Sequence, residues 1–236
     1  MSKNILMRSL YKINSTQWFR DRADEGDLFD LYMQMHEISL RSFEKHLAGD
    51  WEFRFYTKEV DNIQQVFQDH FFETYELWRQ GHNILYCGPD NMMMKPTQFF
   101  DQYDDFRMFN YTDPKHAFGM HFLNADVRYY PADMPENTWS EALVQAENWD
   151  FSEWNTEQII LNKMLWRQEG RTLENTVDPK MAYQGHMLYL NNWEQTKAHS
   201  NAWNNCDIND AHIIHLHGSR NAPAKLELMR ELEKLS

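Results

Sequence analysis

Segments with the patterns of strands and helices alternate through the first 87 residues of this chain of 236. Apolar side chains recur at alternate or successive positions in a strand pattern, and every three to four residues in a helix pattern. Gly49 and Gly81 follow the two helical patterns, and glycine commonly ends a helix. The order strand, helix, strand, helix, strand predicts an α/β fold with a mostly parallel sheet flanked by helices. These segments are 5–11, 28–47, 51–56, 62–80 and 83–87.

The rest of the chain continues the mixture of strand and helix patterns. The polar stretch that ends near residue 27 is expected to be a loop, and 97–103 is expected to form one or two helical turns. A chain of this length provides one α/β domain and is too short for two large ones. We expect further strands at 105–111, 121–130, 187–190 and 211–218, and further helices at 138–149, 155–166 and 225–235.

The chain is acidic, with a formal net charge of -13. Proteins that bind a nucleic-acid backbone do so through clustered lysine and arginine side chains, so we expect no nucleic-acid partner. A ligand that carries phosphate must instead be held locally by a metal ion, by helix N-termini or by a few basic residues.

Cys87 and Cys206 are the only cysteines, and no stretch of about 18 consecutive apolar residues is present. A disulfide framework is therefore not expected, and a reducing compartment fits the cysteine content. We predict a cytoplasmic protein without a membrane span.

The stretch from Asn83 to Pro96 concentrates the residues of chemical interest. Five residues that suit a buried strand are followed by a Gly-Pro turn, by Asp90 and by a second short apolar run that ends at Lys95. Ligands of α/β sheets bind outside the carboxyl ends of the strands. Asp90 is therefore placed to hold a metal ion or a cation that is bound to phosphate.

This stretch resembles a motif of the GT-A fold glycosyltransferases that use nucleotide-sugars, in particular those of glycosyltransferase family 8. Their pattern is an apolar strand, Asp-x-Asp, three apolar residues and often Lys-Pro. Asp90 falls on the second Asp and Lys95 on the Lys, whereas Gly88 replaces the first Asp, so the Asp-x-Asp motif is degenerate.

A second motif of the family, apolar-Asn-x-Gly-Val, resembles the segment from Leu123 to Val127. Asn124 and Val127 match the pattern, and Asp126 stands where the family has Gly. The resemblance implies that Asn124 and Asp126 line the site of the donor sugar. In the same family the end of the first strand meets the nucleotide base, which makes Tyr11 the candidate for that contact.

Two later motifs follow in the same order as in the family. The helix pattern at 155–166 resembles Asp-Gln-x-x-x-Asn, with Glu157 in place of Asp, followed by Gln158 and Asn162. Residues 213–218 resemble apolar-apolar-His-x-x-Gly, with His215 and Gly218. The family continues with Lys-Pro-Trp, and here Arg220 is the basic residue available for a diphosphate.

The resemblance implies one GT-A domain over residues 1–236, with a nucleotide-binding half at about 1–112 and an acceptor-side half at about 113–236. The implied activity is transfer of a sugar, with retention of configuration, from a nucleotide-sugar donor to a hydroxyl group of a glycan, lipid or protein. Glu157 and Gln158 would be catalytic, and Asp90 with His215 would bind Mn or Mg. The implied donor-binding residues are Tyr11, Asp90, Lys95, Asn124, Asp126, Gly218 and Arg220.

Gly88 leaves alternatives open. Without the first acid of the motif, metal binding is expected to be weaker, or Arg220, Lys95 and His215 neutralise the diphosphate without a metal. A non-catalytic relative that binds a nucleotide-sugar or a glycan is the main alternative function. The three histidines at 212, 215 and 217 form a poor zinc site, because His215 and His217 share one face of a strand whereas His212 lies on the other. A nucleotidyltransferase would need a Gly-rich signature near the first strand, and 8–11 has none.

Overall fold

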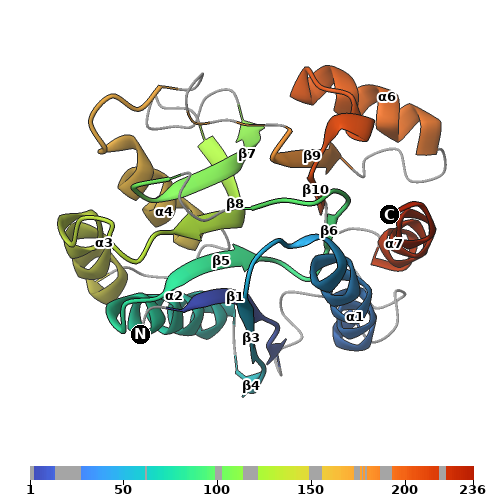
Figure 1. Ribbon diagram of the computed structural model, residues 1–236. Coiled ribbons are helices and arrows are strands. Elements are labelled where there is room, and N and C mark those ends of the chain that lie inside the picture. Colours follow the sequence, from blue (N-terminus) through green and yellow to red (C-terminus); the bar gives the residue numbers. More distant parts are fainter. Residues whose placement is uncertain are drawn as a thin grey trace. The chain divides into compact units, whose positions relative to one another are not determined.

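The computed structural model describes residues 3–13, 28–61, 63–98, 103–113, 122–148, 156–172, 176, 178, 180–186, 193–217 and 222–236 (Figure 1). The chain forms two compact units that alternate along the sequence. The large-sheet unit comprises Met1–Trp18, Asp50–Cys87 and Phe99–Val177. The small-sheet unit comprises Phe19–Gly49, Gly88–Gln98 and Asp178–Ser236.

The strands of the large-sheet unit are β1 (Asn4–Ser9), β2 (Lys12–Ile13), β3 (Trp51–Tyr56), β4 (Glu59–Val60), β5 (Asn83–Cys87), β7 (Arg107–Asp113) and β8 (Phe122–Tyr130). Five of them form a sheet with the order β3-β1-β5-β8-β7, and β2 pairs with β4. β1 is parallel to β3 and β5, β8 is antiparallel to β5, and β7 is antiparallel to β8. Only β8 therefore opposes the other strands of the large sheet, which confirms the predicted, mostly parallel arrangement.

Three helices accompany this sheet: α2 (Ile63–Arg79), α3 (Asn137–Asn148) and α4 (Thr156–Trp166). Helix α2 packs on β5 and α4 packs on β8, while α3 lies against both α2 and α4. Gly81 adopts a φ of 82° directly after α2, a conformation that glycine reaches without the steric cost of a side chain. The sequence placed all three helices correctly to within a few residues.

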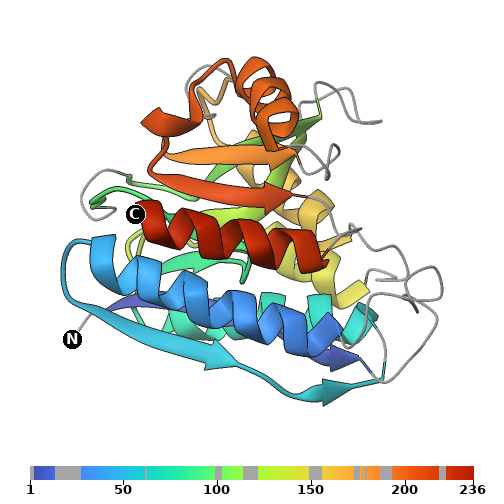
Figure 2. The same ribbon diagram turned by 90° about the vertical axis from the view of Figure 1, so that its right-hand side faces the viewer.

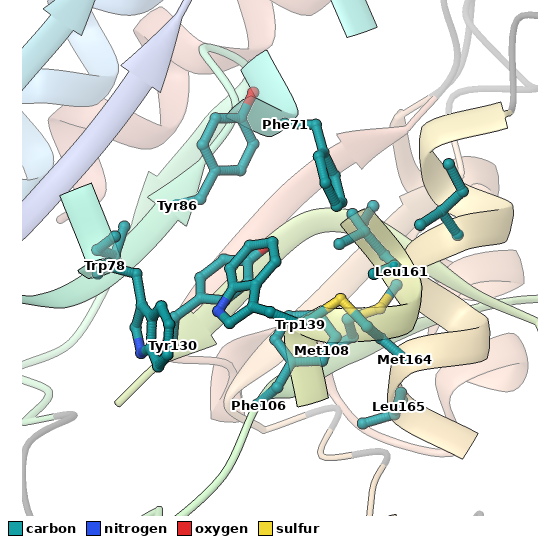
Figure 3. Close-up of a cluster of buried hydrophobic side chains, with 14 of the residues drawn as sticks. Phe71, Trp78, Tyr86, Phe106, Met108, Tyr130, Trp139, Leu161, Met164 and Leu165 are labelled. Atoms are coloured by element: carbon teal, nitrogen blue, oxygen red, sulfur yellow. The ribbon is translucent and has the colours of Figure 1, made fainter. Parts of the chain in front are cut away.

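Aromatic side chains form the centre of the core of the large-sheet unit. Trp139 of α3 is fully buried, and its ring stacks on that of Tyr130 at the end of β8, with centroids 5.3 Å apart (Figure 3). The ring of Phe71 in α2 also contacts Trp139, in an edge-on arrangement with ring centroids 5.4 Å apart. Trp78 donates a hydrogen bond from Nε1 to the carbonyl oxygen of Pro131 (2.9 Å). These contacts fix α2 and α3 on the strands that carry the candidate site residues.

The small-sheet unit contains β6 (Asn91–Met93), β9 (Ala182–His186) and β10 (Ile213–His217), in the order β6-β10-β9. Its central strand, β10, is antiparallel to β6 and parallel to β9. Helices α1 (Leu28–His46) and α7 (Ala222–Leu235) pack along each other and against β6, while α6 (Trp193–Asn204) packs on β9 (Figure 2). A short 3-10 turn at Ile208–Asp210 precedes β10.

Two elements of the small-sheet unit, β9 and α6, were not predicted from the sequence. The segment of β9, Ala-Tyr-Gln-Gly-His, does not alternate, and α6 is too polar to show an apolar stripe. The strand predicted at 187–190 lies outside the described residues. Thr97, which was predicted to be helical, instead forms a parallel β-bridge with Leu47, so that prediction is wrong at this residue. Within the described residues no helix is both long and apolar enough to cross a bilayer.

Replacing Trp139 with alanine is expected to destabilise the protein by about 3–5 kcal/mol, because the change removes a large buried ring and leaves a cavity. Val144 lies on the same helix with 57% of its surface exposed, and Val144→Ala is expected to change stability by no more than about 0.5 kcal/mol. Urea unfolding followed by circular dichroism measures both values. Equal midpoints for the two variants would contradict the central role of the Trp139 ring.

Candidate functional site

The turn after β5 holds Asp90 in a buried position. Asn91 donates a hydrogen bond from Nδ2 to the carbonyl oxygen of Gly88 (3.1 Å), which closes the turn. The carbonyl oxygen of Asp90 accepts a bond from the backbone N–H of Leu216 in β10 (3.0 Å). Only 7% of the Asp90 surface is exposed. The carboxylate is therefore positioned by the turn and by the neighbouring strand.

Asp90 meets two basic side chains of the same unit. Its Oδ2 lies 2.5 Å from Nζ of Lys225 on α7, and its Oδ1 lies 3.8 Å from Nε2 of His215 on β10. Lys225 and His215 are 2% and 1% exposed, respectively. We call Asp90, Gln184, His215 and Lys225 the acid–lysine cluster. The structure thus brings Asp90 together with His215, as predicted, and adds a lysine that the sequence analysis did not include.

Gln184 sets the orientation of the His215 ring. Its Oε1 lies 2.9 Å from Nδ1 of His215, and because an amide oxygen can only accept, Nδ1 carries the proton. Nε2 is the ring nitrogen on the side of Asp90. Gln184 is completely buried, and among the described residues its Nε2 has no hydrogen-bond partner.

The acid–lysine cluster fits an ammonium group better than a divalent metal ion. Mn and Mg prefer several oxygen ligands, whereas the cluster offers one carboxylate and one imidazole. The described residues contain no group of three or more His, Cys, Asp and Glu side chains suited to a metal. The Lys225 ammonium already contacts the carboxylate, and a dication beside it would be repelled at short range in a buried position.

A second buried group of charges lies in the large-sheet unit. Arg128 of β8 donates a hydrogen bond from Nη2 to Oε1 of Glu157 at the start of α4 (2.7 Å). The ring of His70 lies 3.1 Å from the same oxygen, measured from Nδ1. The guanidinium of Arg128 stacks over the ring of Tyr86, 4.1 Å from its centroid. We call His70, Tyr86, Arg128 and Glu157 the arginine cluster.

The pKa of Glu157 reflects this environment. Burial on its own would raise the pKa of the carboxyl group, but the charge of Arg128, with a smaller effect of His70, holds the pKa below its ordinary value. Glu157 is therefore an ionised partner of Arg128 at neutral pH and not a proton donor. Burial likewise raises the pKa of the Tyr86 hydroxyl, which keeps it neutral.

Several predicted donor residues are already bound within the large-sheet unit. Tyr11 is buried, and its hydroxyl donates to the carboxylate of Glu73. The backbone N–H of Asp126 donates to Oδ1 of Asn124 (2.8 Å), so these two residues form a local turn-like contact within β8. Asp126 is partly exposed, unlike its neighbours in the strand.

Gln158 and Asn162, the two amides of the Asp-Gln-x-x-x-Asn pattern, hold α4 to β8. Asn162 accepts a hydrogen bond from the N–H of Leu123 (2.7 Å) and donates one to its carbonyl oxygen (2.8 Å). Gln158 accepts from the N–H of Ala125 (3.2 Å). In the small-sheet unit Asn204 of α6 binds both backbone groups of Gln184 in the same way, at 3.0 and 2.8 Å. We call this arrangement an amide clamp.

The predicted site residues are divided between the two units. Tyr11, Asn124, Asp126, Glu157 and Gln158 belong to the large-sheet unit, whereas Asp90, Lys95 and His215 belong to the small-sheet unit. Lys95 is partly exposed. Gly218 and Arg220 lie outside the described residues, so their predicted roles stay predictions.

Sequence reasoning missed the two buried cations that organise these clusters. Lys225 precedes Met229 by four positions and Leu232 by seven, so it falls within the apolar stripe of the last helix. Arg128 stands among the buried residues of β8. A charged residue in a pattern that otherwise predicts burial is the signal that identifies both, because a buried charge requires a partner.

Comparison with known proteins supports the fold. No protein-family model matches the sequence, and no match was found among curated proteins. A glycosyltransferase involved in the glycosylation of the major capsid of PBCV-1 is similar in structure, with a TM-score of 0.53 and 12% identity, over 97% of this chain and 99% of that one.

Two further solved structures are similar over longer proteins. The bifunctional glycosyltransferase WbbM gives a TM-score of 0.57 at 9% identity, over 99% of this chain and 52% of that one. GlyE of Streptococcus pneumoniae TIGR4 gives 0.51 at 12% identity, over 98% of this chain and 60% of that one. The chain therefore has a mixed α/β fold of the GT-A type that is shared with these glycosyltransferases.

Replacing Glu157 with glutamine is expected to lower the free energy of unfolding at pH 7 by about 3–5 kcal/mol, because Arg128 loses its buried counter-charge. The folded-state pKa of Glu157 lies below its ordinary value of 4.5, so its stabilising contribution is present above pH 4.5 and is lost as the pH falls through the folded-state pKa. The difference between the wild type and the variant should therefore shrink in acid. Urea unfolding at a series of pH values measures it.

Glu76→Gln is the matched control for this prediction. Glu76 is exposed on α2, where it pairs with Arg79 at 2.7 Å, and its replacement is expected to cost no more than about 1 kcal/mol. A loss for Glu157→Gln that is as small as that of the control, or one that does not depend on pH, would contradict the role assigned to the buried pair.

Proposed function

We propose that this protein is a glycosyltransferase that moves a sugar from a nucleotide-sugar donor to a hydroxyl group of an acceptor. The observation that carries the proposal is the GT-A type fold shared with glycosyltransferases over almost the whole chain. The acid–lysine cluster supports it, because Asp90 and His215 come from two separate motifs and lie 3.8 Å apart. A glycan, a lipid and a protein all provide suitable hydroxyl groups.

The proposed reaction needs modest chemistry from the protein. The bond between the anomeric carbon and the diphosphate oxygen breaks, and both electrons leave with the nucleoside diphosphate. A bond forms between the anomeric carbon and the acceptor oxygen, and the acceptor hydroxyl releases its proton to the leaving diphosphate or to water. Positive charge near the diphosphate and a fixed position of the acceptor are the main requirements.

We assign the residues to these tasks as follows. The diphosphate is bound by Asp90, Lys95, His215 and Arg220. The donor sugar is lined by Asn124 and Asp126. Gln158 and Glu157 remain the candidates beside the reacting centre, with retention of configuration as the expected outcome. The pairing of Glu157 with Arg128 supports an electrostatic rather than a proton-transferring part for its carboxylate. The proposal includes a cytoplasmic location, in line with the two free cysteines, and it holds for either a site with Mn or Mg or a metal-independent one.

A non-catalytic relative that binds a nucleotide-sugar or a glycan is the second candidate. It is favoured by the fact that both motif acids, Asp90 and Glu157, are already paired with buried cations of the protein. The two candidates differ in one observable, since only the enzyme releases free nucleoside diphosphate from a nucleotide-sugar.

The proposal predicts that one nucleoside diphosphate raises the melting temperature of the protein. Ligand at about 100 times its dissociation constant stabilises a protein by about 2.7 kcal/mol, which corresponds to about 5–10 °C for a chain of this size. A thermal-shift panel of uridine, guanosine, cytidine and adenosine diphosphates measures the effect. If none of the four diphosphates raises the melting temperature, the result would contradict both the glycosyltransferase and the relative that binds a nucleotide-sugar.

Asp126→Asn tests the catalytic part of the proposal. Loss of the carboxylate is expected to lower the release of diphosphate from the matching nucleotide-sugar by at least about tenfold, a change of about 1.4 kcal/mol in the barrier. Asp133→Asn, at an exposed position of the same unit, is the control and should leave turnover unchanged. Equal turnover in the two variants would remove Asp126 from the site, and no release by the wild type would favour the binding protein.

A further inference from the structure

We propose that the ammonium group of Lys225 takes the place of a divalent cation in the acid–lysine cluster, so that the diphosphate of the donor binds without a metal ion. The inference rests on the proposed function, because it concerns the same site. It replaces the Mn or Mg ion implied by the sequence motifs with a side chain that belongs to the protein.

The position of the ammonium group is the first argument. Nζ of Lys225 lies 2.5 Å from Oδ2 of Asp90, the acid that occupies the place of the second Asp of the metal-binding motif. The same ammonium lies 5.6 Å from the centroid of the Tyr32 ring, a favourable cation–π arrangement. Both contacts come from one compact unit and hold the cation in the interior.

The position of Lys225 near the N-terminus of its helix is the second argument. Lys225 lies in the first turn of α7, which begins at Ala222. Cations are disfavoured at a helix N-terminus, where the helix dipole is positive. A lysine in this place, buried except for 2% of its surface, needs a counter-charge, and Asp90 provides it. The same dipole adds positive potential to the ammonium group for an incoming anion.

The other groups of the cluster also suit an anion. Lys225 contributes a positive charge at Asp90, where a metal ion would otherwise supply it. The Nδ1 of His215 is already committed to Gln184, so Nε2 is the atom that faces Asp90. Gln184 adds a buried Nε2 that has no acceptor among the described residues, and a phosphate oxygen would provide one.

The test uses Mn²⁺ and inorganic pyrophosphate as separate probes, each followed by calorimetry. The wild type should bind pyrophosphate equally well in chelator and in Mn²⁺, and Asp90→Asn should not change its response to Mn²⁺. Lys225→Met keeps the length of the side chain and removes the charge. It should lose at least about tenfold in pyrophosphate affinity in chelator, and Mn²⁺ should restore that affinity by binding at Asp90.

Lys234→Met is the matched control, because it removes the same charge from an exposed position of the same helix. It should behave as the wild type with both probes. If Lys225→Met alone does not fold, the double variant Lys225→Met with Asp90→Asn removes both charges together. That variant should fold, bind pyrophosphate weakly and gain nothing from Mn²⁺.

Two results would overturn the inference. One is Mn²⁺ binding by the wild type that disappears in Asp90→Asn, and the other is pyrophosphate binding that the chelator abolishes. Either result would leave the proposed transferase intact, as a metal-dependent enzyme. Failure of all four nucleoside diphosphates to bind would instead overturn the proposed function, and the Mn²⁺ titrations of the wild type and Lys225→Met would still show which cation the cluster accepts.

Discussion

A buried carboxylate must be balanced by positive charge within the protein, and Asp90 imposes this requirement on the small-sheet unit. Lys225, at the start of α7, provides that charge, and the ring of His215, on the central strand, lies 3.8 Å from the same carboxylate. The buried pair of Asp90 and Lys225 depends on both partners, because removal of one leaves an uncompensated charge in the interior. The helix, the strand and the turn after β5 are thereby joined by the two contacts of one carboxylate, in addition to their apolar packing.

The large-sheet unit obeys the same rule, but here the buried charge that requires a partner is positive. Arg128 cannot lose its charge, so its place among the buried residues of β8 requires an anion, which Glu157 provides from α4. Tyr86 and His70 complete the surroundings of the guanidinium. Each unit thus contains a buried ion pair that joins a helix to a strand or to a turn, and each of the two acids is a residue that the sequence motifs single out.

The sequence predicted the sheet-forming strands well, because β1, β3 and β5 carry clear apolar patterns and are bounded by glycine or polar residues. It also predicted that Asp90 and His215 meet, on the strength of the motifs that contain them. It did not reveal α6, whose helix is stabilised by tertiary packing rather than by an apolar stripe. The ion pairs were missed because pairing is a property of distant segments, and a single buried Lys225 or Arg128 does not name its partner.

The amide clamp at Asn204 has a consequence for solubility. In the small sheet β9 is an edge strand, and such an edge offers unpaired backbone groups to other molecules. Asn204 occupies both the N–H and the carbonyl oxygen of Gln184 with its side-chain amide. A strand of another chain that approaches this edge therefore finds these two groups already bound, which disfavours pairing at Gln184.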